Sequence, residues 1–277
     1  NYDQIFVRDG AVSCFYYLLT GRYEIVAGFL TTIAEQRYLG ASDTPFRPPR
    51  GSMPVSIRVD ENDELQVDHG DRAIARVAPA DSALWWLLVL RAYTRTDSGA
   101  AFAKSKVIGD ALHDVLEILL RPQMSLYPLY FVPDGSFMID RRLGVYGHPL
   151  DVQVLYYAAL GAICEVMELD DQRRDHVQEQ RQQMRAFINK HYWMDHAAAT
   201  RIHHYDVEGY GGEVENPLNI QPESLPRWVV PWLHDDTGYL IGNVGPGRLD
   251  NRFFASGNLL AGTMGLIDDN RHAAILA

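Results

Sequence analysis

The feature that most constrains the fold of this chain is a series of paired segments in which apolar residues recur at helical spacing. The four pairs span residues 11–39, 82–121, 149–191 and 253–277, with breaks at Gly21, between Tyr93 and Gly99, at Asp170-Asp171 and at Asp268-Asp269. No residue-level repeat of fixed period accompanies them, which argues against regular helical arrays. Helical hairpins of this kind favour a solenoid or a closed α/α toroid, so we expect an all-α fold.

Long polar segments rich in glycine and proline separate the helical pairs. They cover residues 44–78, 127–147 and 203–248, and the first contains an alternating run at 55–59 that predicts a small β-hairpin. Loops longer than about 15 residues inside a compact domain are usually functional or disordered. Because these loops carry aromatic residues and paired charges, we expect them to form a site at one mouth of a toroid.

Composition and motif content exclude several functional classes. The 277 residues carry a formal net charge of −11, which disfavours nucleic-acid binding because such partners need a basic surface. No apolar run is long enough to span a bilayer. Cys14 and Cys164 have no CxxC spacing, and the sequence has no His/Cys zinc cluster, HExxH, GxSxG elbow or phosphate loop. We therefore expect a globular, cytoplasmic protein with buried reduced thiols, without metal or cofactor, that acts on a small molecule.

Acidic residues stand beside aromatic residues or arginines at four junctions between a loop and a helix. These junctions contain Arg8-Asp9, Asp81 with Trp85-Trp86, Asp140-Arg141-Arg142, and Asp250 with Arg252. Hydrolysis of a glycosidic bond needs two carboxyl groups, one of which protonates the leaving oxygen. Asp140 is a candidate for that acid because the three apolar residues before it could raise its pKa and keep it protonated.

Each of these residues also has a purely structural interpretation. Asp140 could be a turn residue or one half of a surface pair with a neighbouring arginine, and Asp9 and Asp81 could cap helices. The Trp85-Trp86 pair could fill the core instead of lining a pocket. His148 has no metal-ligand spacing and is a candidate for hydrogen bonding to a substrate.

Six sequence motifs follow one another over essentially the whole chain. They are residues 2–9 (YDQIFVRD), 76–86 (RVAPADSALWW), 134–142 (DGSFMIDRR), 147–153 (GHPLDVQ), 238–243 (GYLIGN) and 252–254 (RFF). In this combination they resemble the alkaline/neutral invertases, glycoside hydrolase family 100. The resemblance implies an (α/α)6 barrel that hydrolyses sucrose to glucose and fructose without metal or cofactor, and about four of its six hairpins are visible here.

The resemblance also implies roles for individual residues. Asp140 matches the family's general acid in an inverting mechanism, and the general base is a Glu in a Trp-Pro-Glu-Tyr-Tyr type of motif that this sequence lacks. The residues expected to hold the substrate are Asp9, Trp86, Arg142, His148, Gln153, Asp250 and Arg252. We therefore expect residues 1–277 to form a single catalytic domain, truncated at the C-terminal end and at the N-terminus, and inactive by itself.

The sequence departs from the family pattern at three positions. Asp151 stands where Glu is usual, Gly10 where a bulky apolar residue is usual, and Leu143 where Met is common. The first two could reshape the sugar pocket, so two alternatives to a sucrose hydrolase stay open. One is another α/α-toroid glucosidase of the trehalase kind, and the other is a non-catalytic carbohydrate-binding relative or an inactive fragment. In each case the expected partner is a small sugar and neither nucleic acid nor a membrane, and the chain could form a homo-oligomer.

Overall fold

The computed structural model describes residues 3–40, 45–72, 76–121, 125–126, 128–137, 145–201, 229–245 and 248–277. The chain divides into two compact units. Unit 1 comprises Asn1–Val145 and Leu155–Arg181, and unit 2 comprises Tyr146–Val154 and Gln182–Ala277. The expectation of a single domain stays a prediction.

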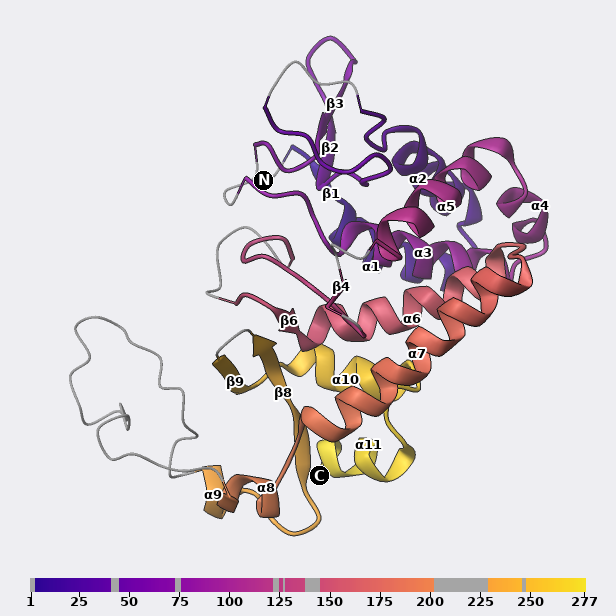
Figure 1. Cartoon of the computed structure of the whole chain (residues 1–277). Helices are drawn as coiled ribbons and strands as arrows, with labels where there is room; N and C mark the ends of the chain where they lie inside the picture. Colours follow the sequence, from indigo (N-terminus) through magenta and orange to yellow (C-terminus); the bar gives the residue numbers. More distant parts are fainter. Residues whose placement is uncertain are drawn as a thin grey trace. The chain divides into compact units, whose positions relative to one another are not determined.

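Helices with a shared apolar core make up most of unit 1. They are α1 (Val7–Leu19), α2 (Tyr23–Glu35), α3 (Ser82–Tyr93), α4 (Gly99–Ala103) and α5 (Lys106–Leu119), and parts of α6 (Leu150–Val166) and α7 (Asp171–His191) belong to the unit as well. Helix α1 packs on α2 and α3, and α2 packs on α3 and α5 (Figure 1). Fully buried residues such as Leu30, Trp86 and Leu116 fill the space between them. No helix in the described residues has the length and hydropathy needed to cross a bilayer.

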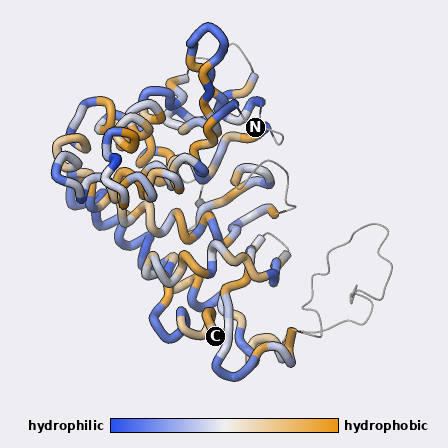
Figure 2. The backbone as a smooth tube through the Cα atoms, turned by 180° about the vertical axis from the view of Figure 1, so that it is seen from behind, coloured by the Kyte–Doolittle hydropathy of each residue, from blue (hydrophilic) through white to orange (hydrophobic). Residues whose placement is uncertain are grey.

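The predicted hairpin in the first long loop is confirmed. Strand β2 (Ser56–Val59) pairs antiparallel with β3 (Leu65–Asp68) and with the short β1 (Ile5–Phe6). The tip of the hairpin, residues 60–64, holds only acidic and amide side chains and is hydrophilic at the top of Figure 2. The Asp60 carboxylate accepts hydrogen bonds from the backbone amides of Asn62 and Glu64, at 2.9 and 3.0 Å, and these bonds lower the pKa of Asp60.

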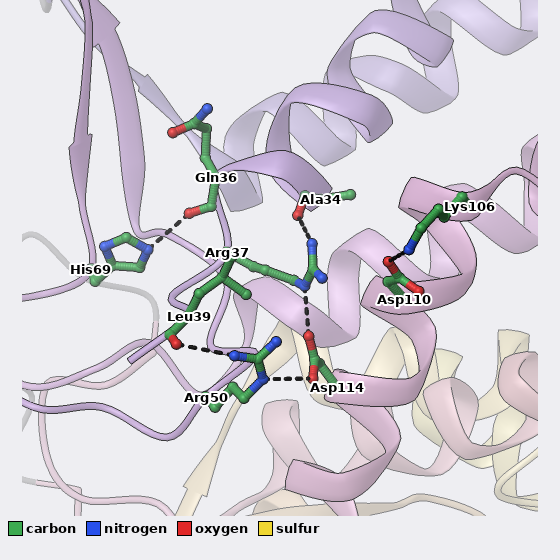
Figure 3. A network of polar contacts seen from close by, with 9 residues as sticks. All are labelled: Ala34, Gln36, Arg37, Leu39, Arg50, His69, Lys106, Asp110 and Asp114. Atoms are coloured by element: carbon green, nitrogen blue, oxygen red, sulfur yellow. Dashed lines mark hydrogen bonds and ion pairs between the residues drawn. The ribbon is translucent and has the colours of Figure 1, made fainter. Parts of the chain in front are cut away.

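An ion-pair network fixes the segment after α2 against α5 (Figure 3). The Arg37 Nε lies 2.8 Å from the Asp114 Oδ2, and the Arg50 Nε lies 3.3 Å from the Asp114 Oδ1. Arg37 also donates from Nη1 to the Ala34 carbonyl at 2.7 Å. Gly51 has a φ of +91°, and a Cβ there would lie 2.6 Å from the Asp114 Cβ, so only glycine fits against α5 at this point.

Unit 2 is built on an antiparallel sheet. Its four strands are β6 (His148–Pro149), β7 (Trp193–Asp195), β8 (Gly238–Gly245) and β9 (Arg248–Phe253), with β8 pairing with each of the others. Helices α8 (His196–Arg201), α9 (Val229–Trp232), α10 (Ala255–Thr263) and α11 (Asp269–Leu276) also belong to this unit. A further two-stranded ladder, β4 (Ser125–Leu126) with β5 (Leu129–Tyr130), lies in unit 1.

These sheets correct the expectation of an all-α chain. The chain is mainly helical, and the predicted helical pairs are found with small differences: α2 ends at Glu35, and the helix predicted for 99–121 is interrupted at Lys104-Ser105. Strand β8 and the first residue of β9 fall in the segment predicted as a loop. The reason is that the first six residues of β8 are all buried, so the strand lacks the alternation that identifies a half-exposed strand.

The network around α5 leads to a stability prediction. Asp114→Ala should lower the free energy of unfolding by about 3 kcal/mol, because it leaves the nearly buried Arg37 guanidinium without its carboxylate. The matched control is Asp110→Ala, one helical turn earlier, whose pair with Lys106 is exposed, so its loss should change the free energy of unfolding far less. Urea unfolding of both variants checks this, and equal losses would contradict the assigned role of Asp114.

Candidate functional site

The acid candidate Asp140 and its neighbour Arg142 lie outside the described residues. The segment that leads to them is anchored in unit 1. The Ala80 amide donates to the Ser136 carbonyl at 2.7 Å, and the Phe137 side chain is buried. The motif containing Asp140 is therefore joined by a backbone hydrogen bond to the loop just before α3.

The described residues on either side of Asp140 are close to each other. The Val145 amide donates to the Asp134 Oδ1 at 3.3 Å. Asp134 is the nearest described carboxylate in the sequence and becomes the alternative acid if Asp140 fails.

The start of α1 is joined to the start of α3 by a part-buried ion pair. The Arg8 Nη1 lies 2.9 Å from the Asp81 Oδ2. Asp81 occupies the N-cap position of α3, but its side chain makes no capping hydrogen bond to the helix. Burial, together with the charge of Asp81, raises the pKa of the neighbouring Tyr130 hydroxyl. Asp9 is exposed in the first turn of α1 and does not occupy the cap position, which belongs to Phe6.

Trp86 is fully buried, and its indole Nε1 donates to the Leu30 carbonyl at 3.0 Å. This arrangement favours the core interpretation of Trp86 over contact with a substrate. Trp85 is less buried, and its Nε1 is shielded from solvent without a hydrogen-bond partner among the described residues. The two adjacent residues differ because one residue along a helix turns the side chain by about 100°.

Unit 2 brings candidates from two distant motifs onto one sheet. His148 lies on β6 and Asp250 lies on β9, and both strands pair with β8. His148 is opposite Val244, and Asp250 is opposite the preceding residue, Asn243. The register therefore places two residues that are 102 positions apart (250 − 148) on neighbouring rows of the same sheet.

Asn243 is a residue of this region that was not among the predicted site residues. It is buried, its Oδ1 accepts from the His148 amide at 2.8 Å, and its Nδ2 donates to the Tyr146 carbonyl at 3.1 Å. The Tyr192 hydroxyl donates to the His148 carbonyl at 2.6 Å. These contacts hold the His148 backbone from both sides. The available signal was an amide within the otherwise apolar 238–243 motif.

The His148 ring is held in one tautomer. Its Nδ1 lies 2.7 Å from the Val244 carbonyl, which can only accept, so Nδ1 carries the proton and Nε2 is the acceptor of the neutral ring. Burial lowers the pKa of His148, and the hydrogen bond to the carbonyl opposes this shift only in part. A neutral imidazole with an acceptor nitrogen is suited to bind a hydroxyl group.

Asp250 and Arg252 form a bidentate pair on β9. The Arg252 Nε lies 2.8 and 2.9 Å from the two Asp250 oxygens, and its Nη2 also donates to Oδ2. The pair raises the pKa of Arg252, and the guanidinium carbon lies 5.5 Å from the centre of the Phe254 ring. The ladder between β8 and β9 has a β-bulge opposite Gly242. The Phe254 ring packs directly against Gly242, where a Cβ would lie 2.7 Å from the ring.

Two further polar residues lie in the first turn of α6. Gln153 is fully buried, and Asp151 is buried beside α10, where Ser256 and the Gly257 amide hydrogen-bond to its carboxyl group. Burial raises the pKa of Asp151 despite these bonds. The first turn of α6 thus contributes an amide and a carboxyl group to the part of unit 2 that holds His148.

The described residues place part of the predicted site in each unit. Unit 2 holds His148, Gln153, Asp250 and Arg252, and unit 1 holds Asp9 and Trp86. In the described part of the chain, no three His, Cys, Asp or Glu side chains form a candidate metal site. Unit 2 instead offers an imidazole acceptor, a carboxylate and a guanidinium, which are groups that hydrogen-bond to a polyhydroxylated ligand.

Comparison with known proteins identifies the family. The model of the family described as "Alkaline and neutral invertase" matches residues 1–277. The chain belongs to this family. The order of the six motifs is therefore that of an alkaline and neutral invertase.

Plant invertases are similar to this chain over nearly all of its length. "Neutral/alkaline invertase 1, mitochondrial" of Oryza sativa subsp. japonica is 36% identical over 274 residues, which is 94% of this chain and 44% of the relative. "Alkaline/neutral invertase E, chloroplastic" of Arabidopsis thaliana is 36% identical over 100% of this chain and 47% of its own. "Cytosolic invertase 1" of Oryza sativa subsp. japonica is 34% identical over 100% of this chain and 50% of its own. The chain spans about half the length of these relatives.

One solved structure, a glycoside hydrolase from family 105 of C. acetobutylicum, resembles the chain weakly. It covers 70% of this chain and 50% of its own, with a TM-score of 0.40 and 9% sequence identity. A likeness at this level supports no conclusion about the fold of this invertase-family chain.

The state of His148 leads to a prediction on pH dependence. Because the folded state disfavours the charged ring, the unfolded state binds more protons between the lowered folded-state pKa and its own value of about 6.5. The stability that the neutral ring contributes is complete above about pH 6.5 and is lost as the pH falls toward the folded-state pKa.

His148→Asn keeps an N–H donor for the Val244 carbonyl but removes the titrating ring. Its free energy of unfolding should therefore fall less between about pH 7 and pH 5 than that of the wild type. Urea unfolding across this range measures the difference, with exposed His234→Asn as the control. The same pH dependence in wild type and His148→Asn would rule out a depressed pKa at His148.

Proposed function

We propose that this protein hydrolyses sucrose to glucose and fructose by an inverting acid/base mechanism. The observation that carries the proposal is the match of the alkaline and neutral invertase family to all 277 residues. Relatives at 34–36% identity are named invertases, and they cover at least 94% of the chain. The chain spans about half the length of those proteins.

Asp140 would be the general acid. It stands in the DGSFMIDRR motif after three apolar residues, and the acid that protonates a glycosidic oxygen must hold its proton near neutral pH. The hydrogen bonds of Asp134 and Ser136 anchor the described part of this motif. Fructose leaves as an alkoxide-like group, so its departure depends on this proton.

The second carboxyl group would activate water on the opposite side of the sugar ring. In an inverting enzyme the two carboxyl groups lie about 6.5–9.5 Å apart, which leaves room for that water. The resemblance assigns the base to a Glu in a motif that is absent from these 277 residues. None of the described carboxyl groups is assigned to this role.

The sugar would be bound by the polar groups of the candidate site. His148 would accept a hydrogen bond from a sugar hydroxyl at Nε2, and Arg252 would donate from the edge that Asp250 does not use. The remaining proposed ligands are Asp9, Arg142, Gln153 and Trp86, and the burial of Trp86 makes it the weakest of these. A neutral sugar requires no metal for binding, which agrees with a site made of hydrogen-bonding side chains.

We also propose that the complete protein is an (α/α)6 toroid. The support is the packing of α1 on α2 in unit 1 and the membership of the family. A cytoplasmic location is proposed as well, and one relative is named cytosolic while others are named mitochondrial or chloroplastic.

The decisive experiment is Asp140→Asn in the complete natural protein. The variant keeps the shape of the side chain but removes the proton donor, so turnover of sucrose should fall by at least about a thousandfold with little change in binding. An activated aryl glucoside, if accepted, should be much less affected because its leaving group needs less protonation. The measurement is turnover of both substrates by wild type and variant.

Three outcomes would redirect the proposal. Retention of more than about a tenth of sucrose turnover would show that Asp140 is not the acid, and Asp134 or Asp151 would be tested next. A wild-type protein that cleaves trehalose but not sucrose would favour the trehalase-like alternative. Sugar binding without any hydrolysis would favour a non-catalytic relative.

A further inference from the structure

Asp151 lies between the two groups of candidate sugar-binding residues in unit 2. In the sequence it follows His148 by three residues and precedes Gln153 by two. In space its carboxyl group meets the first turn of α10, where the Ser256 side chain and the Gly257 amide hydrogen-bond to it. Helix α10 begins three residues after Arg252. Asp151 therefore joins the start of α6, which follows His148, to the start of α10, which follows β9.

The starts of α6 and α10 touch closely enough to transmit a displacement. A Cβ at Gly257 would lie 2.8 Å from the Leu150 Cγ and 3.0 Å from the Asp151 backbone nitrogen. Only glycine allows this approach, because those contacts are shorter than side chains normally make. A change at the carboxyl group would therefore move backbone in both helices.

Helix α10 is in turn fastened to the sheet. The Asn258 Oδ1 accepts from the Leu240 amide at 2.8 Å, and its Nδ2 donates to the Leu240 carbonyl at 2.9 Å. Leu240 is part of β8, the strand that pairs with both β6 and β9. The contact at Asp151 thus completes a continuous series of contacts from β6 through α6 and α10 to β8, which itself pairs with β6.

A buried carboxyl group at position 151 lowers the stability of the fold, which is unexpected for a residue with a purely structural role. The side chain is 4% exposed, and its Oδ2 has no hydrogen-bond partner among the described residues. A buried polar atom without a partner lowers stability, and an apolar side chain of similar shape would avoid this cost. The raised pKa of Asp151 is consistent with a carboxyl group that is poorly solvated.

We propose that Asp151 is a positioning residue that couples the start of α6 to the start of α10 and so sets the arrangement of His148 relative to Asp250 and Arg252. The coupling follows from the contacts within unit 2. Its consequence for sugar binding rests on the proposed function. Asp151 acts through these other side chains and does not itself contact the substrate.

The test compares an isosteric apolar variant with an isosteric polar one, in the full chain. Asp151→Leu removes the acceptor for Ser256 and Gly257, whereas Asp151→Asn keeps an oxygen in its place. Nitrogen NMR of the His148 ring and of the Arg252 Nε reports the geometry without any ligand. We expect both signals to shift in Asp151→Leu and to stay near their wild-type positions in Asp151→Asn.

Two further variants separate positioning from loss of stability. Ile188→Ala removes a fully buried side chain elsewhere in unit 2, so it should lower stability without moving the His148 and Arg252 signals together. Ser256→Ala removes one partner of Asp151 from an exposed position, and it keeps the test decisive if Asp151→Leu does not fold. It should shift the same two signals, and by a smaller amount.

Measurements of sugar binding distinguish a failure of this inference from a failure of the proposed function. In titrations with sucrose, Asp151→Leu should lose affinity by about tenfold or more, while Asp151→Asn should stay within about threefold of wild type. A wild type that binds no sugar would overturn the proposed function, and the NMR comparison would still decide the coupling. Unchanged His148 and Arg252 signals in both Asp151→Leu and Ser256→Ala would overturn the positioning role.

Discussion

Strand β8 runs through unit 2 with its first six residues buried, so its backbone polar groups must be paired inside the protein. Strands β6, β7 and β9 supply most of the partners, and the Asn258 side chain supplies both for Leu240. Everything else in this unit depends on that pairing. His148 and Asp250 are placed by the backbone ladders on either side of β8, and Asn243 holds the β6 backbone from within β8 itself.

The helical part of the fold could be predicted because each helix carries its own periodic apolar pattern. Helix α3 spans Ser82–Tyr93, the residues over which the pattern itself extends. Strand β8 could not be predicted in this way, since burial of both faces removes alternation and its three glycines suggest a loop. Those glycines permit close contacts: a Cβ at Gly238 would lie 2.4 Å from the Trp193 ring.

The sequence could identify candidate residues of the site, but it could not predict which residues their side chains contact. Asp81 has the sequence of a helix cap, yet it pairs with Arg8, which is 73 positions away and outside any local window. Trp86 was expected at the sugar, but the rotation of α3 directs it to the Leu30 carbonyl in the core. Motifs identify which residues are unusual, and only the packing of the elements determines what each side chain faces.

The bidentate pair on β9 has a consequence for the entropy of ligand capture. The Arg252 guanidinium is held along one edge by Asp250 and lies 5.5 Å from the Phe254 ring centre, yet the side chain remains 51% exposed. A free arginine loses about 2 kcal/mol of rotamer entropy when it is immobilised, and here that loss occurs during folding. The outward N–H groups are already oriented before a diol binds. A larger part of the free energy of each new hydrogen bond would therefore contribute to the affinity.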